Sequence, residues 1–302
     1  MNKMPRACLL LLATTVIWGF AMAYQREASQ HVDPFTFNAC RFTLGALVML
    51  PFRRREKRLL HLKITGRRIL CSVSVGAALF AASCLQQAGV RDAGAGKTGF
   101  LTSLYVVLVP VLGAFFGRRT TKFTWIALGM AMPALYLLCM GENEAFTFSA
   151  WDGLLLLSAL MWAVQILLTD HFVRAVPPVT LCTVQFAACA LFNWALAFAI
   201  EDVQWVNIRA ALIPILYCGV FSTAVGYTLQ TIGQKDCPPA LSALILSLES
   251  VFCVLAGAVM LGERMGARSY VGCCLMLAAV LTAQLGTIYV VAKEKRNALR
   301  NR

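Results

Sequence analysis

The chain repeats itself after 144 residues, and each copy contains five apolar segments. Adding 144 to a position in the first half finds the same residue type at Trp18 and Trp162, Pro34 and Pro178, Phe42 and Phe186, Gln86 and Gln230, and Gly89 and Gly233. Five membrane crossings per copy would turn the second copy upside down relative to the first. Many transporters build a site that can face either side of the membrane in this way. The repeat therefore predicts two inverted five-helix units.

Composition indicates that the apolar segments lie in lipid. Hydrophobic residues make up 59% of the chain and charged residues 14%, against about 25% charged residues in typical soluble domains. Roughly 20 mostly apolar residues cross a bilayer, and the chain has ten such runs: Cys8–Tyr24, Val32–Phe52, Ile69–Gly89, Ala95–Gly117, Phe123–Met140, Trp151–Thr169, Val179–Ile200, Ala210–Gly233, Ala240–Leu261 and Tyr270–Val291. Because a helix satisfies its own backbone groups, we expect an all-α integral membrane protein with ten transmembrane helices.

The repeat also sets the expected domain boundaries. We expect the first unit over residues 7–141, the second over residues 150–290, and a basic cytoplasmic tail over residues 291–302. The first apolar run resembles a signal peptide, with the cleavage-like sequence Ala21-Met22-Ala23. Cutting there would leave the first unit one helix short, so we interpret this run as a retained first helix.

The basic residues predict the orientation in the membrane. With the N-terminus inside, the tails and inner loops hold 20 of the 27 Lys and Arg residues, and the outer loops hold six. We expect the protein to lie in the cytoplasmic membrane of the cell. The positive-inside rule then places both termini in the cytoplasm. The basic loop over residues 53–68 is expected to face anionic lipids rather than nucleic acid.

Polar residues inside the apolar runs predict a cavity, because such residues usually face the interior of a helix bundle. Ser158, Trp162, Gln165 and Thr169 share one stripe of the sixth helix. The alternative for each Ser or Thr is a hydrogen bond to its own backbone. The predicted cavity residues are Trp18, Gln86, Thr98, Thr102, Tyr105, Trp162, Gln165, Tyr227, Gln230, Ser247 and Glu249.

Two charged residues, Arg41 and Glu249, lie at the centres of their predicted helices. An isolated charge at the bilayer centre costs about 2.5–3.5 kcal/mol, so a partner, water or neutralisation is expected. Two interpretations remain open. The residues brace one another as an ion pair, or Glu249 contributes to substrate binding or proton coupling.

The chain resembles the EamA family of the drug/metabolite transporter superfamily. The similarity rests on Trp18-Gly19, the segment from Pro34 to Arg41-Phe42, and residues 95–105, 246–252 and 261–264. It covers about residues 7–290 in two copies, although Arg118 follows Gly117 where the second copy has Glu263 after Gly262. The resemblance implies ten helices, a central cavity, and export or exchange of small metabolites.

These observations favour a secondary transporter of a small polar or amphipathic metabolite such as an amino acid, working by alternating access, with linkage to protons left open. A lipid-headgroup flippase is the alternative, and an intramembrane enzyme is disfavoured because no nucleophile and base lie at one depth. We expect no catalytic residue, no metal and no cofactor, and either a monomer or a homodimer.

Pro110 has no counterpart in the ninth helix and predicts a kink in one half only.

Overall fold

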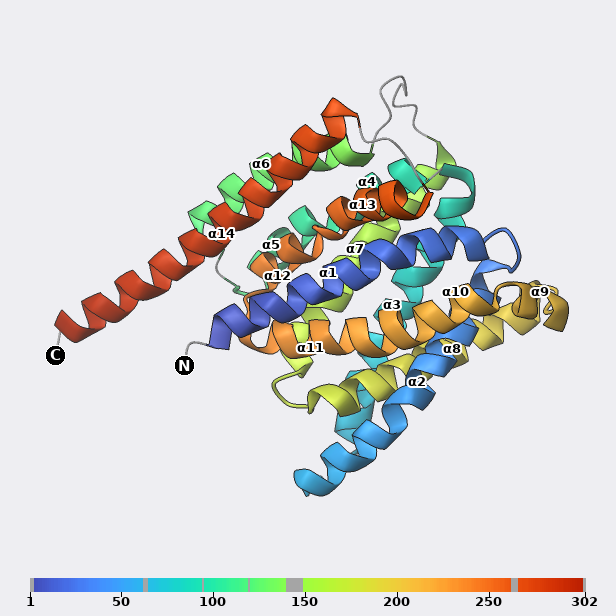
Figure 1. Cartoon of the computed structure of the whole chain (residues 1–302). Helices are drawn as coiled ribbons and strands as arrows, with labels where there is room; N and C mark the ends of the chain where they lie inside the picture. Colours follow the sequence, from blue (N-terminus) through green and yellow to red (C-terminus); the bar gives the residue numbers. More distant parts are fainter. Residues whose placement is uncertain are drawn as a thin grey trace.

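The computed structural model describes residues 3–61, 65–93, 95–118, 120–139, 149–261 and 266–300, and its regular structure there is helical (Figure 1). The helices are α1 (Lys3–Ala28), α2 (Pro34–Leu59), α3 (Gly66–Ala93), α4 (Ala95–Ser103), α5 (Tyr105–Phe115), α6 (Lys122–Cys139), α7 (Ala150–Phe172), α8 (Pro178–Ile200), α9 (Trp205–Ala210), α10 (Leu212–Tyr217), η1 (Cys218–Gly226), α11 (Tyr227–Asp236), α12 (Pro239–Leu246), α13 (Glu249–Leu261) and α14 (Ala267–Arg300). Ten described segments are long and apolar enough to cross a membrane. The predicted fold class is confirmed.

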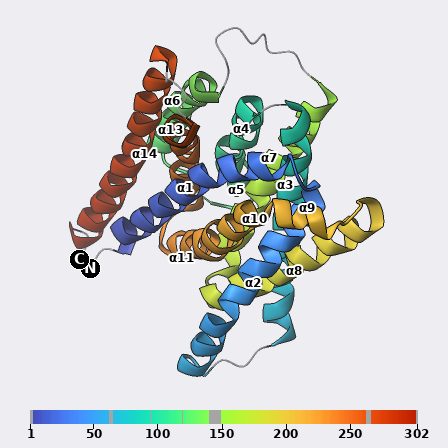
Figure 2. The same cartoon turned by 45° about the vertical axis from the view of Figure 1, so that its right-hand side comes forward.

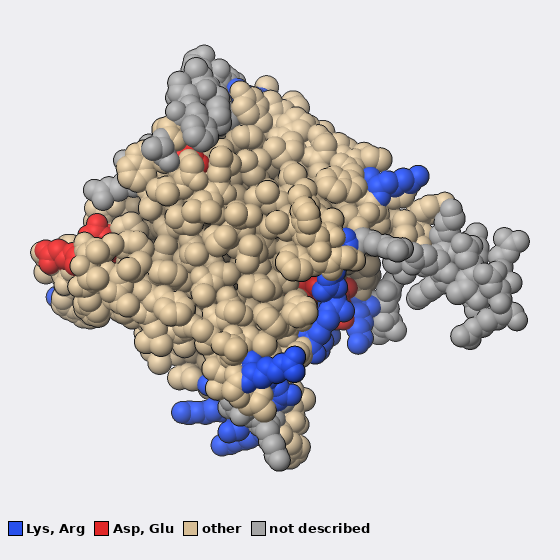
Figure 3. Space-filling model, turned by 180° about the vertical axis from the view of Figure 1, so that it is seen from behind, with Lys and Arg blue, Asp and Glu red and all other residues tan. Residues whose placement is uncertain are grey.

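Both ends of the chain lie at the same side of the bundle (Figures 1 and 2), which we call the terminal side; the opposite side is the far side. Figure 3 shows most of the visible Lys and Arg residues near the terminal side, with some Asp and Glu residues among them, then a broad band without charge, and further Asp and Glu residues toward the far side. Large apolar side chains such as Leu9, Phe198 and Leu285 are exposed. A charge-free apolar belt of this kind suits contact with lipid.

The equivalent helices α2 and α8 run antiparallel and cap each other. The carboxylate of Glu201, just after α8, accepts hydrogen bonds of 2.7 Å from the Phe35 and Thr36 backbone N–H groups at the start of α2. At the other end, the carboxylate of Glu56 accepts hydrogen bonds from the Thr180 backbone N–H at 2.8 Å and from its hydroxyl at 2.7 Å. Helix N-termini favour negative charge. Equivalent helices in opposite directions, closed by equivalent caps, match the inverted repeat.

Two spans that the sequence predicts as continuous helices are broken. The span expected over Ala95–Gly117 divides into α4 and α5 at Leu104, whose N–H bonds to the Leu101 carbonyl three residues earlier. The span expected over Ala240–Leu261 divides into α12 and α13, where the Leu248 N–H bonds to the Ile245 carbonyl. Such tighter turns interrupt the regular α-helical ladder.

The two breaks occupy equivalent positions in the two repeats, whereas the kink expected at Pro110 in one half only stays a prediction. The break at Leu104 precedes Pro110 by a turn and a half, and Pro110 itself lies inside α5. The hydroxyls of Ser103 and Ser250 lie 3.4 Å apart, which places the breaks beside each other. Asymmetry arises elsewhere, since the π-helix η1 interrupts only the second-repeat span.

Candidate functional site

A central cavity lies between the two repeats, and both helix breaks contribute to its wall. Measured as space open to the centres of water molecules, its volume is about 50 Å³, enough for several waters. Along α1 its lining runs from Trp18 to Gln25, from the middle of the bundle toward the far side. The lining residues are Trp18, Met22, Gln25, Arg41, Gln86, Thr102, Tyr105, Trp162, Ile166, Ser222, Tyr227, Gln230, Leu246 and Glu249.

Most of the residues predicted from the sequence meet in this cavity, and three lie outside its lining. Gln165 is buried behind Gln230, whose side-chain amide Nε2 donates a hydrogen bond to Gln165 Oε1 at 3.4 Å. Ser247 donates to the Leu244 carbonyl at 2.8 Å, the local bond that the sequence left as the alternative for Ser and Thr. Thr98 is also buried, and its backbone carbonyl accepts from Thr102 at 2.7 Å.

Three aromatic residues form one wall of the cavity. The ring of Tyr227 lies 4.7 Å from that of Trp18 and 6.3 Å from that of Trp162, measured between centroids. The indole of Trp18 donates to the Ser222 carbonyl of the π-helix at 3.2 Å. Gly226 allows this approach, because an added Cβ there would lie 2.6 Å from Trp18 Nε1. π-helical turns often occur at functional sites.

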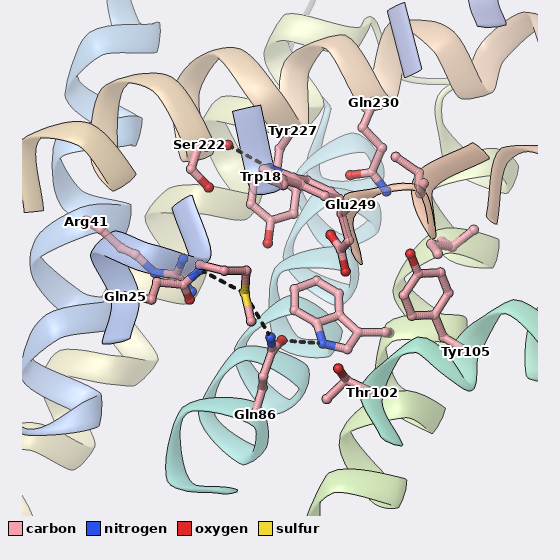
Figure 4. A pocket seen from close by; sticks show the side chains of 14 residues that line it. Trp18, Gln25, Arg41, Gln86, Thr102, Tyr105, Ser222, Tyr227, Gln230 and Glu249 are labelled. Carbon is pink, nitrogen blue, oxygen red and sulfur yellow. Dashed lines mark hydrogen bonds between the residues drawn. The ribbon is translucent and has the colours of Figure 1, made fainter. Parts of the chain in front are cut away.

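Polar contacts cross the cavity between the two repeats. The indole of Trp162 donates to Gln86 Oε1 at 2.8 Å (Figure 4). The Tyr105 hydroxyl and Gln230 Oε1 have no hydrogen-bond partner among the described residues. Both residues line the cavity, although the two atoms themselves are buried in this conformation.

The charged residues Arg41 and Glu249 both line the cavity, but they form no ion pair with one another. Arg41 Nε instead donates to Asn38 Oδ1 at 2.9 Å, and the guanidinium lies over the ring of Phe42 at 4.6 Å from its centroid. Figure 4 shows the two charged side chains reaching the cavity from different helices. The brace that the sequence left open is therefore not formed in this conformation.

Five lining residues were not predicted from the sequence: Met22, Gln25, Ile166, Ser222 and Leu246. Gln25 had a usable signal, because it follows Trp18 by two helical turns and shares its stripe. Met22, Ile166 and Leu246 look like ordinary core residues. Ser222 lines the cavity from the π-helix η1, which the sequence pattern does not reveal.

A second cavity, of about 500 Å³, lies toward the terminal side, where α5, α7 and α11 end and α12 begins. Arg118, Arg174 and Lys235 line it. The buried carboxylate of Asp170 pairs with Arg118 at 2.5 Å and with Arg174 at 3.4 Å. This charged cluster ties the end of α7 to the segment after α5, between the central cavity and the terminal side. Among the described residues, no group of His, Cys, Asp and Glu is placed to hold a metal.

A family model described as the EamA-like transporter family matches residues 5–140 and again residues 149–283. The chain belongs to this family. The resemblance to EamA transporters is thus confirmed, and one model matching twice accounts for the repeat. The motif over residues 262–264 lies outside the described residues. Membership also confirms that this EamA-like chain is a multi-pass membrane transporter and not an enzyme.

Named proteins similar to this EamA-like chain are also transporters. An uncharacterized transporter of Archaeoglobus fulgidus is 28% identical over 285 residues, covering 92% of this chain and 86% of that protein. The threonine/homoserine exporter RhtA of Escherichia coli is 23% identical over 300 residues, covering 98% and 96%. A solved structure titled only as a crystal structure of a protein matches with a TM-score of 0.78 at 17% identity, over 93% of this chain and 97% of that one. At that identity the likeness shows the fold alone.

Proposed function

We propose that this EamA-like protein is a secondary transporter that exports or exchanges a small polar or amphipathic amino acid across the cytoplasmic membrane by alternating access. The observation that carries this proposal is the central cavity, which combines residues of both repeats with two opposite charges at its wall that form no ion pair with a described residue. Broken helices beside a midplane cavity are typical of secondary transporters. The name of the similar exporter RhtA supports an amino acid as cargo.

Glu249 is the proposed site of proton linkage. It begins α13 at a helix break and lines the cavity, where an ionised carboxylate away from a cation is costly. Binding of a proton or of a substrate ammonium group would offset that cost. The orientation that supports export places the terminal side, with its many Lys and Arg residues, in the cytoplasm.

Exchange in proteoliposomes tests the proposal. Vesicles loaded with unlabelled threonine or homoserine should take up the same labelled amino acid faster than protein-free vesicles, and excess unlabelled amino acid should compete. Nucleosides and a fluorescent lipid serve as comparison cargo, with and without a pH gradient. Failure of every amino acid in a broad panel, with movement of a nucleoside or the lipid instead, would contradict the proposal.

A further inference from the structure

Arg41 is a buried cation for which the described part of the protein supplies no counter-charge. Its exposed fraction is 3%. Its side chain makes a hydrogen bond from Nε to Asn38 Oδ1 and cation–π contacts with the rings of Phe37 and Phe42, whose centroids lie 5.5 and 4.6 Å from the guanidinium carbon. No described carboxylate forms an ion pair with it. Buried charges are normally paired, because an isolated charge in an apolar interior is costly.

The guanidinium keeps its forked end free. The bond to Asn38 uses Nε, and neither terminal nitrogen makes a hydrogen bond with a described residue. Arg41 also lines the central cavity, toward which Figure 4 shows it extending. A planar guanidinium with free terminal donors matches a carboxylate in two parallel hydrogen bonds. The site thus has a donor set, a charge and an accessible space that suit one anionic group.

We propose that Arg41 binds the carboxylate of the transported molecule and so selects α-amino acids over their uncharged or purely cationic analogues. This assignment rests on the proposed function and names the contact that determines substrate class. Glu249 lines the same cavity without an ion pair to Arg41, so both opposite charges are open to the two ends of a zwitterion. The ammonium group then faces Glu249, and the aromatic wall of Trp18 and Tyr227 receives the carbon chain.

Comparison of an amino acid with its carboxamide tests this assignment directly. The carboxamide keeps the ammonium group, the side chain and the size, but it lacks the negative charge. In the wild-type protein, threoninamide should compete for labelled threonine exchange at least about 30-fold more weakly than threonine, because an unpaired buried charge remains. Equal competition by the two compounds would overturn the assignment. This measurement needs no variant, so folding of a mutant does not limit it.

Variants test whether Arg41 is the residue that discriminates between threonine and threoninamide. In Arg41→Gln the preference for threonine over threoninamide should disappear, and Arg41→Lys should keep part of it because charge remains without the fork. Arg209→Gln, a change of the same charge at an exposed position of α9, should leave the preference intact. Full discrimination in folded Arg41→Gln protein would contradict the proposal. If no amino acid exchanges at all, the proposed function fails; if exchange occurs without discrimination, only the assignment of Arg41 fails.

Discussion

Glu249 is the residue on which the mechanism depends most directly. It lines the cavity, and its carboxylate makes no hydrogen bond or ion pair with another described residue. Replacement by Gln keeps size and hydrogen bonding but removes titration. Because Arg41 bonds to Asn38 instead, we expect Glu249→Gln to keep the thermal stability of the wild type. It should bind substrate measurably but more weakly, because the ammonium group loses its carboxylate, and it should lose accumulation driven by a pH gradient.

The matched control for this residue is Glu27→Gln, an exposed position near the end of α1. It should transport like the wild type under the same gradient. Accumulation that persists in folded Glu249→Gln protein would remove Glu249 from proton coupling. A marked loss of thermal stability would instead show that the carboxylate has a bracing role in another conformation.

Sequence alone could predict the cavity residues that lie on polar helical stripes. Trp18, Trp162, Gln86 and Gln230 stand out because large polar groups are rare inside apolar runs and recur in both repeats. Gln165 shares the stripe yet lies behind Gln230. Residue spacing predicts which face of a helix a side chain lies on, but not whether it reaches the cavity or is covered by another side chain. Met22 and Ser222 could not be predicted, since Met22 resembles a core residue and Ser222 lies in the π-helix η1, which hydropathy does not reveal.

At the scale of elements, the energetic contributions of the caps of α2 and α8 can be measured and compared. Each carries a carboxylate that caps the other, so Glu56→Gln and Glu201→Gln should each lower the free energy of unfolding by about 1–2 kcal/mol, the usual worth of a helix N-cap. Thermal unfolding in detergent measures both, with Glu27→Gln as the exposed control. A large effect of one variant and none of the other would show that the two caps are not energetically equivalent.

The ends of the elements follow from sequence signals more readily than their interruptions do. Pro34, Pro178 and Pro239 each begin a helix, where a missing N–H costs nothing. The breaks at Leu104 and Leu248 lie inside apolar spans, beside polar residues such as Ser103 and Ser250. Hydropathy does not distinguish bonds to the third residue back from bonds to the fourth. The π-helix η1 was missed for the same reason.

For the whole molecule, the charge distribution predicts the side that faces the cytoplasm. Leu60 is 56% exposed at the terminal side, where α2 ends. A cysteine introduced at position 60 should resist a membrane-impermeant maleimide applied to intact cells and react in inside-out vesicles. Position 203, in the far-side segment between α8 and α9, should react from outside. The reverse pattern would contradict the proposed orientation.

We expect the ion pairs of Asp170 with Arg118 and Arg174 to hold the terminal side closed. Because Arg118 and Arg174 are 37% and 56% exposed, water can solvate them when Asp170→Asn removes their partner. We expect this variant to fold and to favour opening on the terminal side. The buried Cys237, which lines the adjacent cavity, should then react faster with a maleimide, as measured by mass spectrometry.

The exposed far-side variant Asp202→Asn is the control for this opening. Its Cys237 labelling should equal that of the wild type. Labelling that is also unchanged in Asp170→Asn would mean that the charged cluster does not hold this side closed.

The reciprocal caps of α2 and α8 have a consequence for biogenesis. Synthesis begins at the N-terminus, so α2 is complete well before Glu201 leaves the ribosome, and the Phe35 and Thr36 amides must wait for their acceptor. By contrast, Glu56 is already present when Thr180 is made. Two caps that are equivalent in the finished protein thus form in a fixed temporal order. The first repeat provides the cap of α8 as soon as α8 is made, whereas the start of α2 is capped only after the second repeat has been synthesised as far as Glu201.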